Sequence, residues 1–322
     1  RDVKMWQVPP NGQGIAGLIA LSGYDYLVKE CKMPLKKNSQ KLHTMIELMR
    51  LGFADARAFI CDPDVSYTSN TEGESHDNKR KKSVRWLLDK ERIKKRIKSV
   101  FNPEKAVIQG IPDPTSCTVS FQVVDKSGNA VSFVNSNFMG FGTGIVPYGC
   151  GFTLQNRGYG FEIQDDKHPN IIAPRKRPYH TIIPGILTHH NESNDLFATF
   201  SNMGGFMQPQ GHFQIAIQMI DTLENEKDNL KSDLAILDPQ EIIDLPRFCI
   251  ADGTSNGKVF IEEGFDTSTL NDLKDMGHDL CTDISGHSRS LFGKAQIIKR
   301  DKNTGVLWAG SDGRADGCAM GF

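Results

Sequence analysis

The chain has 322 residues, of which 38% are hydrophobic and 24% are charged. This composition is typical of a globular protein with a sizeable core, and the length suggests about two domains. The formal net charge is −1, which provides no field to attract nucleic acid or an anionic membrane. No apolar run approaches the roughly 18 residues of a transmembrane helix.

Seven cysteines are scattered through the chain, and none belongs to a CxxC pair. An odd number without such pairs argues against a disulfide framework and against a structural zinc site. Reduced thiols favour a cytoplasmic protein. The compartment stays undetermined, because a signal peptide could have preceded Arg1.

The first elements in chain order are a strand and two helices. Residues 5–8 predict a short strand, and the Pro/Gly-rich turn at 9–14 sets the start of a helix over 15–22. Apolar residues recur at helical spacing over 40–59, which predicts the second helix.

Residues 66–82 are polar, have no periodicity and end in the basic run 79–82. We interpret them as a flexible, solvated loop rather than as a polyanion-binding patch. A basic helix with one apolar side is predicted at 83–100, and the proline-containing segment 101–114 is expected to be extended.

The most informative stretch is 114–144. β-Branched and aromatic residues at 118–124 and 130–134 flank an Asp-Lys-Ser-Gly-Asn turn, which predicts a β-hairpin with a positive φ at Gly128. A buried strand does not need nucleophile-capable side chains at its start, whereas an enzyme that cleaves its own chain there would. Four such side chains stand here, namely Thr115, Ser116, Cys117 and Thr118.

Beyond the hairpin, glycines at 140, 142 and 144 form a GxGxG. A dinucleotide fingerprint requires a helix directly after the glycines, and Ile145-Val146-Pro147 does not begin one. We therefore interpret these glycines as close backbone packing around a pocket. A strand that ends in a loop is predicted for residues 151–160.

A second glycine motif follows a short apolar strand predicted at 196–200. Residues 201–205 lead from it into a helix that begins near Pro209. This arrangement places free backbone N–H groups of Gly204 and Gly205 at the positive end of a helix dipole, where a reacting carbonyl can approach closely. The alternative is a tight turn alone.

The remaining residues predict short alternating elements. A helix is expected at 239–244, and residues 260–279 predict a strand, a glycine turn and a helix. Pro246-Arg247-Phe248 is interpreted as a packing element. The last strands are predicted within 292–298 and 306–312.

The order of these residues resembles the γ-glutamyltranspeptidase family of N-terminal nucleophile hydrolases, which are precursors that cleave themselves before a threonine. The run Val-Val-Asp-Lys-Ser-Gly-Asn-Ala-Val at 123–131 matches the family's run after that threonine. Counting back seven residues from Asp125 reaches Thr118, not Thr115. The residues at 119–120 and 135–142 look more like the glutathione hydrolase-like branch than the typical transpeptidases.

The resemblance covers nearly the whole chain and implies a mixed α/β (α+β) fold, a four-layer αββα sandwich with antiparallel sheets. Cleavage between Cys117 and Thr118 would leave residues 1–117 as the C-terminal part of a large subunit. Residues 118–322 would be the small, catalytic subunit, and the two would remain together as a heterodimer. The first part of the large subunit would be missing from this chain, and the C-terminus looks complete.

The resemblance also implies roles for single residues. Thr118 would be the nucleophile, and its α-amine after cleavage would be the base. Ser136 would hydrogen-bond the nucleophile, while Gly204 and Gly205 would form the oxyanion hole. Neither a cofactor nor a metal is needed for this chemistry.

The sequence departs from the family where the substrate is bound. The transpeptidases hold the donor's α-ammonium with a glutamine and an aspartate, and ungapped counting places Arg157 and Gly160 there. Asn137 is adjacent to the position of a family asparagine, and His180 and Thr181 replace two pocket-lining serines. Because an arginine cannot accept a hydrogen bond from an ammonium, the pocket favours an acyl group without the α-amine.

These features predict a self-processing threonine amide hydrolase or acyltransferase. Its substrates would be γ-glutamyl or glutaryl-like amides such as glutathione, with water or an amine as acceptor. One alternative is a catalytically silent homologue that acts as a binding or scaffold protein. Another is a metallohydrolase whose candidate ligands lack an HxH or HExxH spacing, namely His180, His189, His190 and His212.

Overall fold

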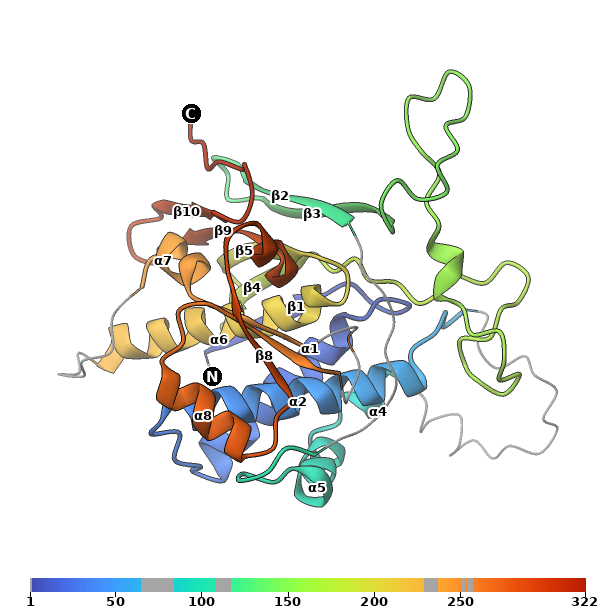
Figure 1. Cartoon of the computed structure of the whole chain (residues 1–322). Coiled ribbons are helices and arrows are strands. Elements are labelled where there is room, and N and C mark those ends of the chain that lie inside the picture. The colour runs from blue at the N-terminus through green and yellow to red at the C-terminus, as the bar shows by residue number, and fades with distance from the viewer. Residues whose placement is uncertain (1, 65–83, 108–116, 229–236, 251–252, 254–256) are drawn as a thin grey trace.

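The computed structural model describes residues 2–64, 84–107, 117–228, 237–250, 253 and 257–322. The predicted loop at 66–82 and two of the four nucleophile-capable residues, Thr115 and Ser116, lie outside these ranges. The central element is a five-stranded antiparallel sheet of order β1-β4-β5-β9-β10 (Figure 1). Its strands are β1 (Val3–Gln7), β4 (Gly185–His189), β5 (Leu196–Met203), β9 (Lys294–Arg300) and β10 (Leu307–Ser311).

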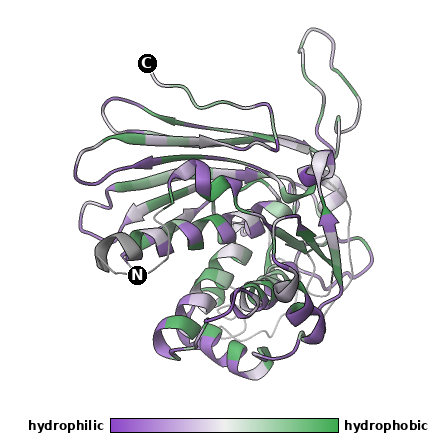
Figure 2. Cartoon of the chain, turned by 60° about the vertical axis from the view of Figure 1, so that its left-hand side comes forward, coloured by the Kyte–Doolittle hydropathy of each residue, from purple (hydrophilic) through white to green (hydrophobic). Residues whose placement is uncertain are grey.

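Three long helices lie on the side of one face of this sheet (Figures 1 and 2) and pack against one another in the order α6, α1, α2, with α6 in contact with the sheet. They are α1 (Gly14–Asp25), α2 (Asn38–Phe59) and α6 (Met207–Asp228). Fully buried side chains such as Ile19, Ile46 and Phe213 form one connected core between them. Gly52 allows α2 to approach α1 closely, because a Cβ there would overlap the Ala16 carbonyl oxygen.

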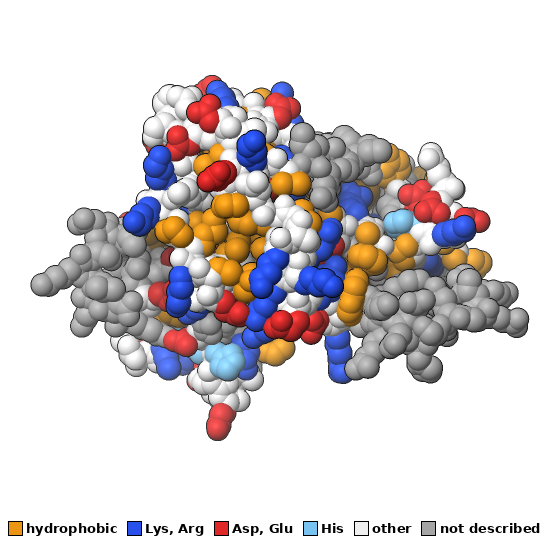
Figure 3. Space-filling model, turned by 90° about the horizontal axis from the view of Figure 1, so that it is seen from below, with side chains coloured by type: hydrophobic (Ala, Val, Ile, Leu, Met, Phe, Trp, Pro, Cys, Tyr) orange, Lys and Arg blue, Asp and Glu red, His pale blue; other side chains and the backbone are white. Residues whose placement is uncertain are grey.

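Shorter helices complete this side of the molecule. They are η1 (Tyr26–Glu30), α4 (Val84–Leu87), α5 (Lys90–Val100), α7 (Pro239–Asp244), α8 (Thr267–Asp275) and η4 (Gly286–Phe292). The single helix predicted at 83–100 is wrong, because Asp89 has extended backbone and caps α5 through a hydrogen bond from Arg92 N–H at 2.8 Å. Seen from below, hydrophobic side chains gather in the middle of the molecule and charged ones surround them (Figure 3). Among the described helices, none combines the length and apolarity needed to cross a bilayer.

The predicted hairpin is confirmed and lies over the other face of the sheet (Figure 1). It consists of β2 (Cys117–Val124) and β3 (Ala130–Phe138), with Gly128 at a φ of +84° in the turn. Its inner face is polar. Gln122 donates a hydrogen bond to Ser201 at 2.7 Å and accepts one from Thr199 at 2.8 Å, so the hairpin is attached to β5 through side chains.

The outer face of the hairpin is apolar and open. Phe121 and Phe133 stack with their ring centroids 4.8 Å apart, and the exposed fractions of the apolar side chains on this face lie between 46% and 65%. They are Val119, Phe121, Val123, Val131 and Phe133. Within the described ranges no helix covers them, and the fold is mixed α/β.

A small third sheet combines β6 (Phe248–Ile250), β7 (Val259–Glu262) and β8 (Leu280–Ile284). β6 and β7 are antiparallel, but β7 and β8 are parallel. The expectation of antiparallel sheets therefore does not hold here. The reason is that α8 connects β7 to β8 as a crossover, and a crossover helix returns the chain in the same direction.

The segment between β3 and β4 projects from the body of the molecule (green in Figure 1). The strand predicted at 151–160 is wrong, because this stretch is a loop that ends in the 3₁₀ helix η2 (Arg157–Gly160). Gly149 and Gly151 have φ values of +74° and +70°, and such left-handed backbone does not continue a strand.

Candidate active site

Thr118 lies where the regular pairing of β2 with β3 is interrupted, opposite Ser136 and Asn137. The Thr118 residue is only 3% exposed, and its Oγ1 atom has no hydrogen-bond partner in the described part of the chain. A buried hydroxyl without a partner is costly in an ordinary core. Thr118 is therefore a candidate reactive group on structural grounds as well.

A pocket of about 540 Å³ opens beside Thr118, between the hairpin, the end of β5 and the start of β9. Three of the predicted site residues, Thr118, Ser136 and Asn137, come together in its wall. The full lining is Thr118, Val119, Ser120, Asn135, Ser136, Asn137, Gly140, Phe141, Met203, Lys294, Gln296, Ala315 and Gly317.

The two polar residues opposite Thr118 are held by their own contacts. Ser136 Oγ accepts a hydrogen bond from the Phe138 N–H at 2.9 Å. Asn137 Nδ2 donates to Thr153 Oγ1 at 2.5 Å. The orientation of both side chains is thus fixed before any substrate enters.

The glycine pair lies directly after Met203, which lines the pocket. Gly204 and Gly205 have φ values of +126° and +60°, a backbone conformation that residues other than glycine rarely adopt. Their carbonyls accept bonds from Met207 N–H at 3.0 Å and Gln208 N–H at 3.2 Å. Among the described residues, no partner is found for either glycine N–H, so both donors remain available.

Asn202 holds the strand that enters this turn. Its backbone N–H donates to His212 Nε2 at 3.1 Å, so the neutral His212 ring carries its proton on Nδ1. That N–H faces the Gln7 side-chain amide at 3.0 Å, and the amide must present its oxygen there to accept the hydrogen bond. Burial lowers the pKa of His212 to about 3, which keeps the ring neutral and able to accept this bond.

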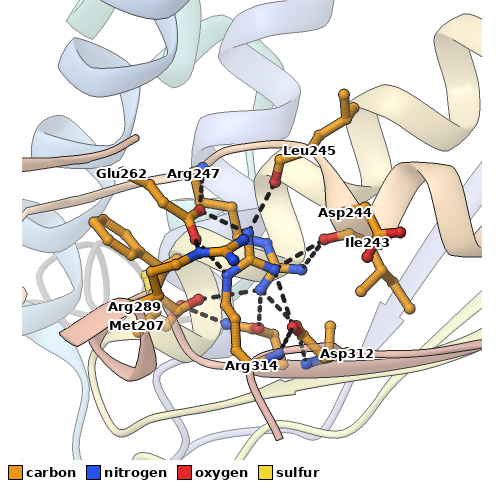
Figure 4. Close-up of polar contacts among 12 residues, drawn as sticks. Met207, Ile243, Asp244, Leu245, Arg247, Glu262, Arg289, Asp312 and Arg314 are labelled. Carbon is orange, nitrogen blue, oxygen red and sulfur yellow. Dashed lines mark hydrogen bonds and ion pairs between the residues drawn. The ribbon is translucent and has the colours of Figure 1, made fainter. Parts of the chain in front are cut away.

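Behind the turn lies a buried network of arginines and carboxylates (Figure 4). Arg247 donates to Asp312 at 2.9 Å, and Arg314 donates to Glu262 and Asp312 at 2.6 and 2.9 Å. Arg289 adds a bond to Glu262 at 2.7 Å. The network holds the backbone near Arg314 in place. Shortly after Arg314 come Ala315 and Gly317, which belong to the pocket wall.

Arg157 lies behind the pocket wall and does not line the pocket described here. It is 3% exposed, and it donates to Thr181 Oγ1 at 2.9 Å and to the Ser136 carbonyl at 3.4 Å. Its guanidinium also lies 5.0 Å from the Phe138 ring centroid. Burial lowers its pKa to about 10, and no carboxylate partner occurs in the part of the chain that the structure describes.

His180 and Thr181 are grouped with Arg157 rather than with Thr118. The His180 ring accepts a hydrogen bond from the Ile182 N–H at 3.2 Å, and burial together with the Arg157 charge lowers its pKa to about 4. Thr181 is 1% exposed. The four histidines considered as metal ligands do not converge, since no group of three or more His, Cys, Asp or Glu side chains suited to a metal occurs in the described residues.

Lys294, Gln296, Ala315 and Gly317 line the pocket, although no motif in the sequence predicts it. Lys294 and Gln296 lie two positions apart on β9 and therefore point to the same side. Their place beside Thr118 depends on the pairing of Lys294 with Met203 across β5 and β9. The alternation of polar and apolar residues at 294–297 was the signal that could have suggested this, but not which sheet face the pocket occupies.

The fold places an unpaired threonine hydroxyl at the start of a hairpin strand and beside a pocket, which makes it a candidate nucleophile. The model of the gamma-glutamyltranspeptidase family matches residues 1–322, and the chain belongs to this family.

Two of the relatives are named as hydrolase proenzymes. The chain is 29% identical to the glutathione hydrolase-like YwrD proenzyme of Bacillus subtilis over 330 residues, covering 100% of this chain and 54% of the relative. It is 29% identical to the oxamate amidohydrolase proenzyme of Klebsiella pneumoniae over 323 residues, covering 99% and 53%. The crystal structure of cephalosporin acylase from Bacillus halodurans matches with a TM-score of 0.77 and 36% identity, covering 98% of this chain and 50% of that one. The chain thus spans about half the length of the relatives it matches.

Proposed function

We propose that the protein is a self-processing amide hydrolase or acyltransferase whose nucleophile is Thr118. The observation that carries the proposal is the buried Thr118 Oγ1, which has no partner among the described residues and borders a pocket next to a glycine turn with free N–H groups. Membership of the γ-glutamyltranspeptidase family supports it.

Processing follows from the same hydroxyl. Thr118 Oγ1 attacks the carbonyl carbon of Cys117, and the Cys117–Thr118 amide bond is replaced by an ester. Water then hydrolyses that ester, which leaves a carboxylate on Cys117 and a free α-amine on Thr118. This amine, with an unperturbed pKa of about 7.7–8.0, is the base that a threonine hydroxyl needs in order to act as a nucleophile near neutral pH.

Turnover repeats the attack on an external amide. Thr118 Oγ1 adds to the substrate carbonyl while its proton passes to the α-amine, and the N–H groups of Gly204 and Gly205 stabilise the oxyanion. Collapse expels the amine, which takes up the proton, and leaves an acyl ester on Thr118. Water or an acceptor amine then releases the acyl group.

The subunits and the missing layer belong to the same proposal. Residues 1–117 would be part of a large subunit and residues 118–322 the small subunit of a heterodimer, consistent with relatives named as proenzymes. The apolar outer face of the hairpin would receive the fourth, helical layer from the rest of the large subunit. A sample of 1–322 alone is then expected to be weakly active and poorly soluble.

For the substrate, we propose γ-glutamyl or glutaryl-like amides. Asn137 would contact the substrate directly, since it lines the pocket. Arg157 with His180 and Thr181 would act from behind the wall formed by Ser136, where a buried positive charge disfavours a substrate ammonium.

The test is the fate of the full-length protein on incubation. Mass spectrometry and N-terminal sequencing are expected to find a fragment that begins at Thr118. Thr118→Ala should stay intact. Thr118→Ser keeps a hydroxyl and should still be processed, although more slowly than the wild type. Thr115→Ala is the matched control and should be processed normally. A fragment that begins at Thr115, Ser116 or Cys117 would show that another nucleophile is used, and an intact wild type would favour the silent homologue.

A further inference from the structure

Lys294 is the one charged side chain among the thirteen residues that line the Thr118 pocket. The others are apolar, hydroxyl or amide residues and glycines, and no acidic residue is among them. Lys294 is half-buried and forms no ion pair within the described part of the chain. An ammonium without a counter-ion at the wall of a pocket attracts an anion from solution.

The backbone of Lys294 is fixed next to the glycine turn. It pairs with Met203 across β5 and β9, and the following residue, Ala295, donates its N–H to Asp312 at 2.7 Å. On the other side, a Cβ added to Gly204 would lie 3.3 Å from Gly293 Cα. The backbone of Lys294 is therefore held by the same network that holds the turn, and only its flexible side chain can move.

The surroundings add to the positive potential. Arg157 lies one layer behind the wall and donates to the Ser136 carbonyl at 3.4 Å. Gln296 lies on the same side of β9 as Lys294 and lines the same pocket with a side-chain amide, which can donate a hydrogen bond. A carboxylate would find a charge-assisted partner in Lys294 and a neutral donor in Gln296, whereas an ammonium would find no acid.

We propose that Lys294 determines specificity by binding a carboxylate of the substrate, so that the enzyme acts on anionic amides. The inference rests on the proposed function and deepens it, because it assigns the substrate class to a residue in direct contact with the pocket. The carboxylate could be carried by the acyl part or by the leaving amine, and the experiment below distinguishes the two.

Equilibrium binding gives the first test. Titration calorimetry on the full-length protein would compare glutarate with the neutral glutaramide. Lys294→Met should weaken glutarate binding by about ten- to a hundredfold, as expected for a lost charged hydrogen bond, and leave glutaramide unchanged. Lys294→Arg should retain most of the affinity. Lys299→Met, which removes the same charge from the same strand outside this pocket, should behave as wild type.

Kinetics give the second test. Glutaryl-p-nitroanilide carries its carboxylate on the acyl part, butyryl-p-nitroanilide carries none, and butyrylglycine carries it on the leaving amine. The ratio of kcat/KM between an anionic donor and butyryl-p-nitroanilide should fall in Lys294→Met for whichever donor places its carboxylate at Lys294. Unchanged ratios for both anionic donors, together with glutarate binding that is absent or insensitive to Lys294, would overturn the inference.

The two proposals fail separately. Self-cleavage at Thr118 is measured on the same samples by mass spectrometry. If cleavage is absent, the proposed function fails whatever glutarate does. If cleavage occurs and the Lys294 variants bind and select like wild type, only the assignment of Lys294 is wrong.

Discussion

Arg247 Nη1 donates a hydrogen bond to Asn202 Oδ1 at 3.2 Å, and this contact joins the buried charge network to the strand that enters the glycine turn. Asn202 stands two residues before Gly204, and the same Arg247 nitrogen is held by Asp312 at 2.9 Å. A change in the network therefore reaches the proposed oxyanion hole through a single side chain.

The network should dominate stability at this end of the molecule. Asp312→Asn leaves two buried guanidinium groups short of a counter-charge and is expected to cost about 3–5 kcal/mol in the free energy of unfolding. Burial disfavours the charged form of Asp312, but Arg247 and Arg314 outweigh it and hold its pKa below the ordinary value. Its contribution is therefore present above about pH 4 and lost as pH falls through the lowered pKa.

Urea unfolding of the wild type, of Asp312→Asn and of a control variant measures this loss of stability. Lys258→Met removes one partner of the exposed pair with Asp279 and should cost less than about 1 kcal/mol. Equal losses in the two variants would contradict the special weight given to the buried pair.

The glycine turn should be intolerant of side chains. Gly204→Ala places a Cβ at a φ of +126° and 3.3 Å from both Gly293 Cα and Met207 Cβ. The turn must shift, so its N–H groups move away from the oxyanion, and kcat should fall by about 10²–10³. Gly128→Ala is the matched control, since its φ is +84° but open space surrounds it. It should lose some stability and keep kcat.

Arg157 should affect the choice between donors with and without an α-amine. Because its buried charge disfavours an ammonium, wild type should prefer glutaryl- over γ-glutamyl-p-nitroanilide by about ten- to a hundredfold in kcat/KM. Arg157→Gln should reduce this preference. Arg175 is an exposed arginine of the segment before β4, and Arg175→Gln should leave this preference unchanged. A wild type that prefers the γ-glutamyl donor, with no change in Arg157→Gln, would mean that another residue binds the amine.

His212 predicts a pH dependence of stability. Its pKa is about 3 in the folded protein, against about 6.5 in the unfolded chain. The unfolded state therefore binds the proton first, and stability falls as pH decreases from about 6.5 toward 3, by about 1.4 kcal/mol per pH unit for this group. His212→Gln keeps an acceptor for Asn202 N–H and should show a shallower slope by about one proton. The exposed His287→Gln is the control.

Local signals predicted several elements well. The turn residues at 125–129 specified the hairpin, and the helix expected at 239–244 is α7, which the structure shows to begin with a capping box of Asp238 and Glu241. These elements depend on residues that are neighbours in sequence. The break at Asp89 was missed because an apolar periodicity continued on both sides of it, although an aspartate is a good N-cap.

The site was predictable only in part. Thr118, Ser136 and Asn137 belong to one hairpin, so their proximity followed from its pairing. Lys294 reaches the pocket through β5 and β9, and Arg247 meets Asp312 across 65 residues of sequence. No local pattern encodes such contacts. The Pro-Arg-Phe segment was interpreted as packing, and its arginine instead forms the centre of a charged network.

The position of Ala315 and Gly317 in the wall beside Thr118 has a consequence for biosynthesis. The ribosome adds Thr118 to the nascent chain long before it adds Ala315 and Gly317. Until then this part of the pocket wall is missing. If the proposed cleavage needs the assembled pocket, the peptide bond stays intact during most of translation. Processing would then mark the moment at which Ala315 and Gly317 have emerged and taken their places in the wall.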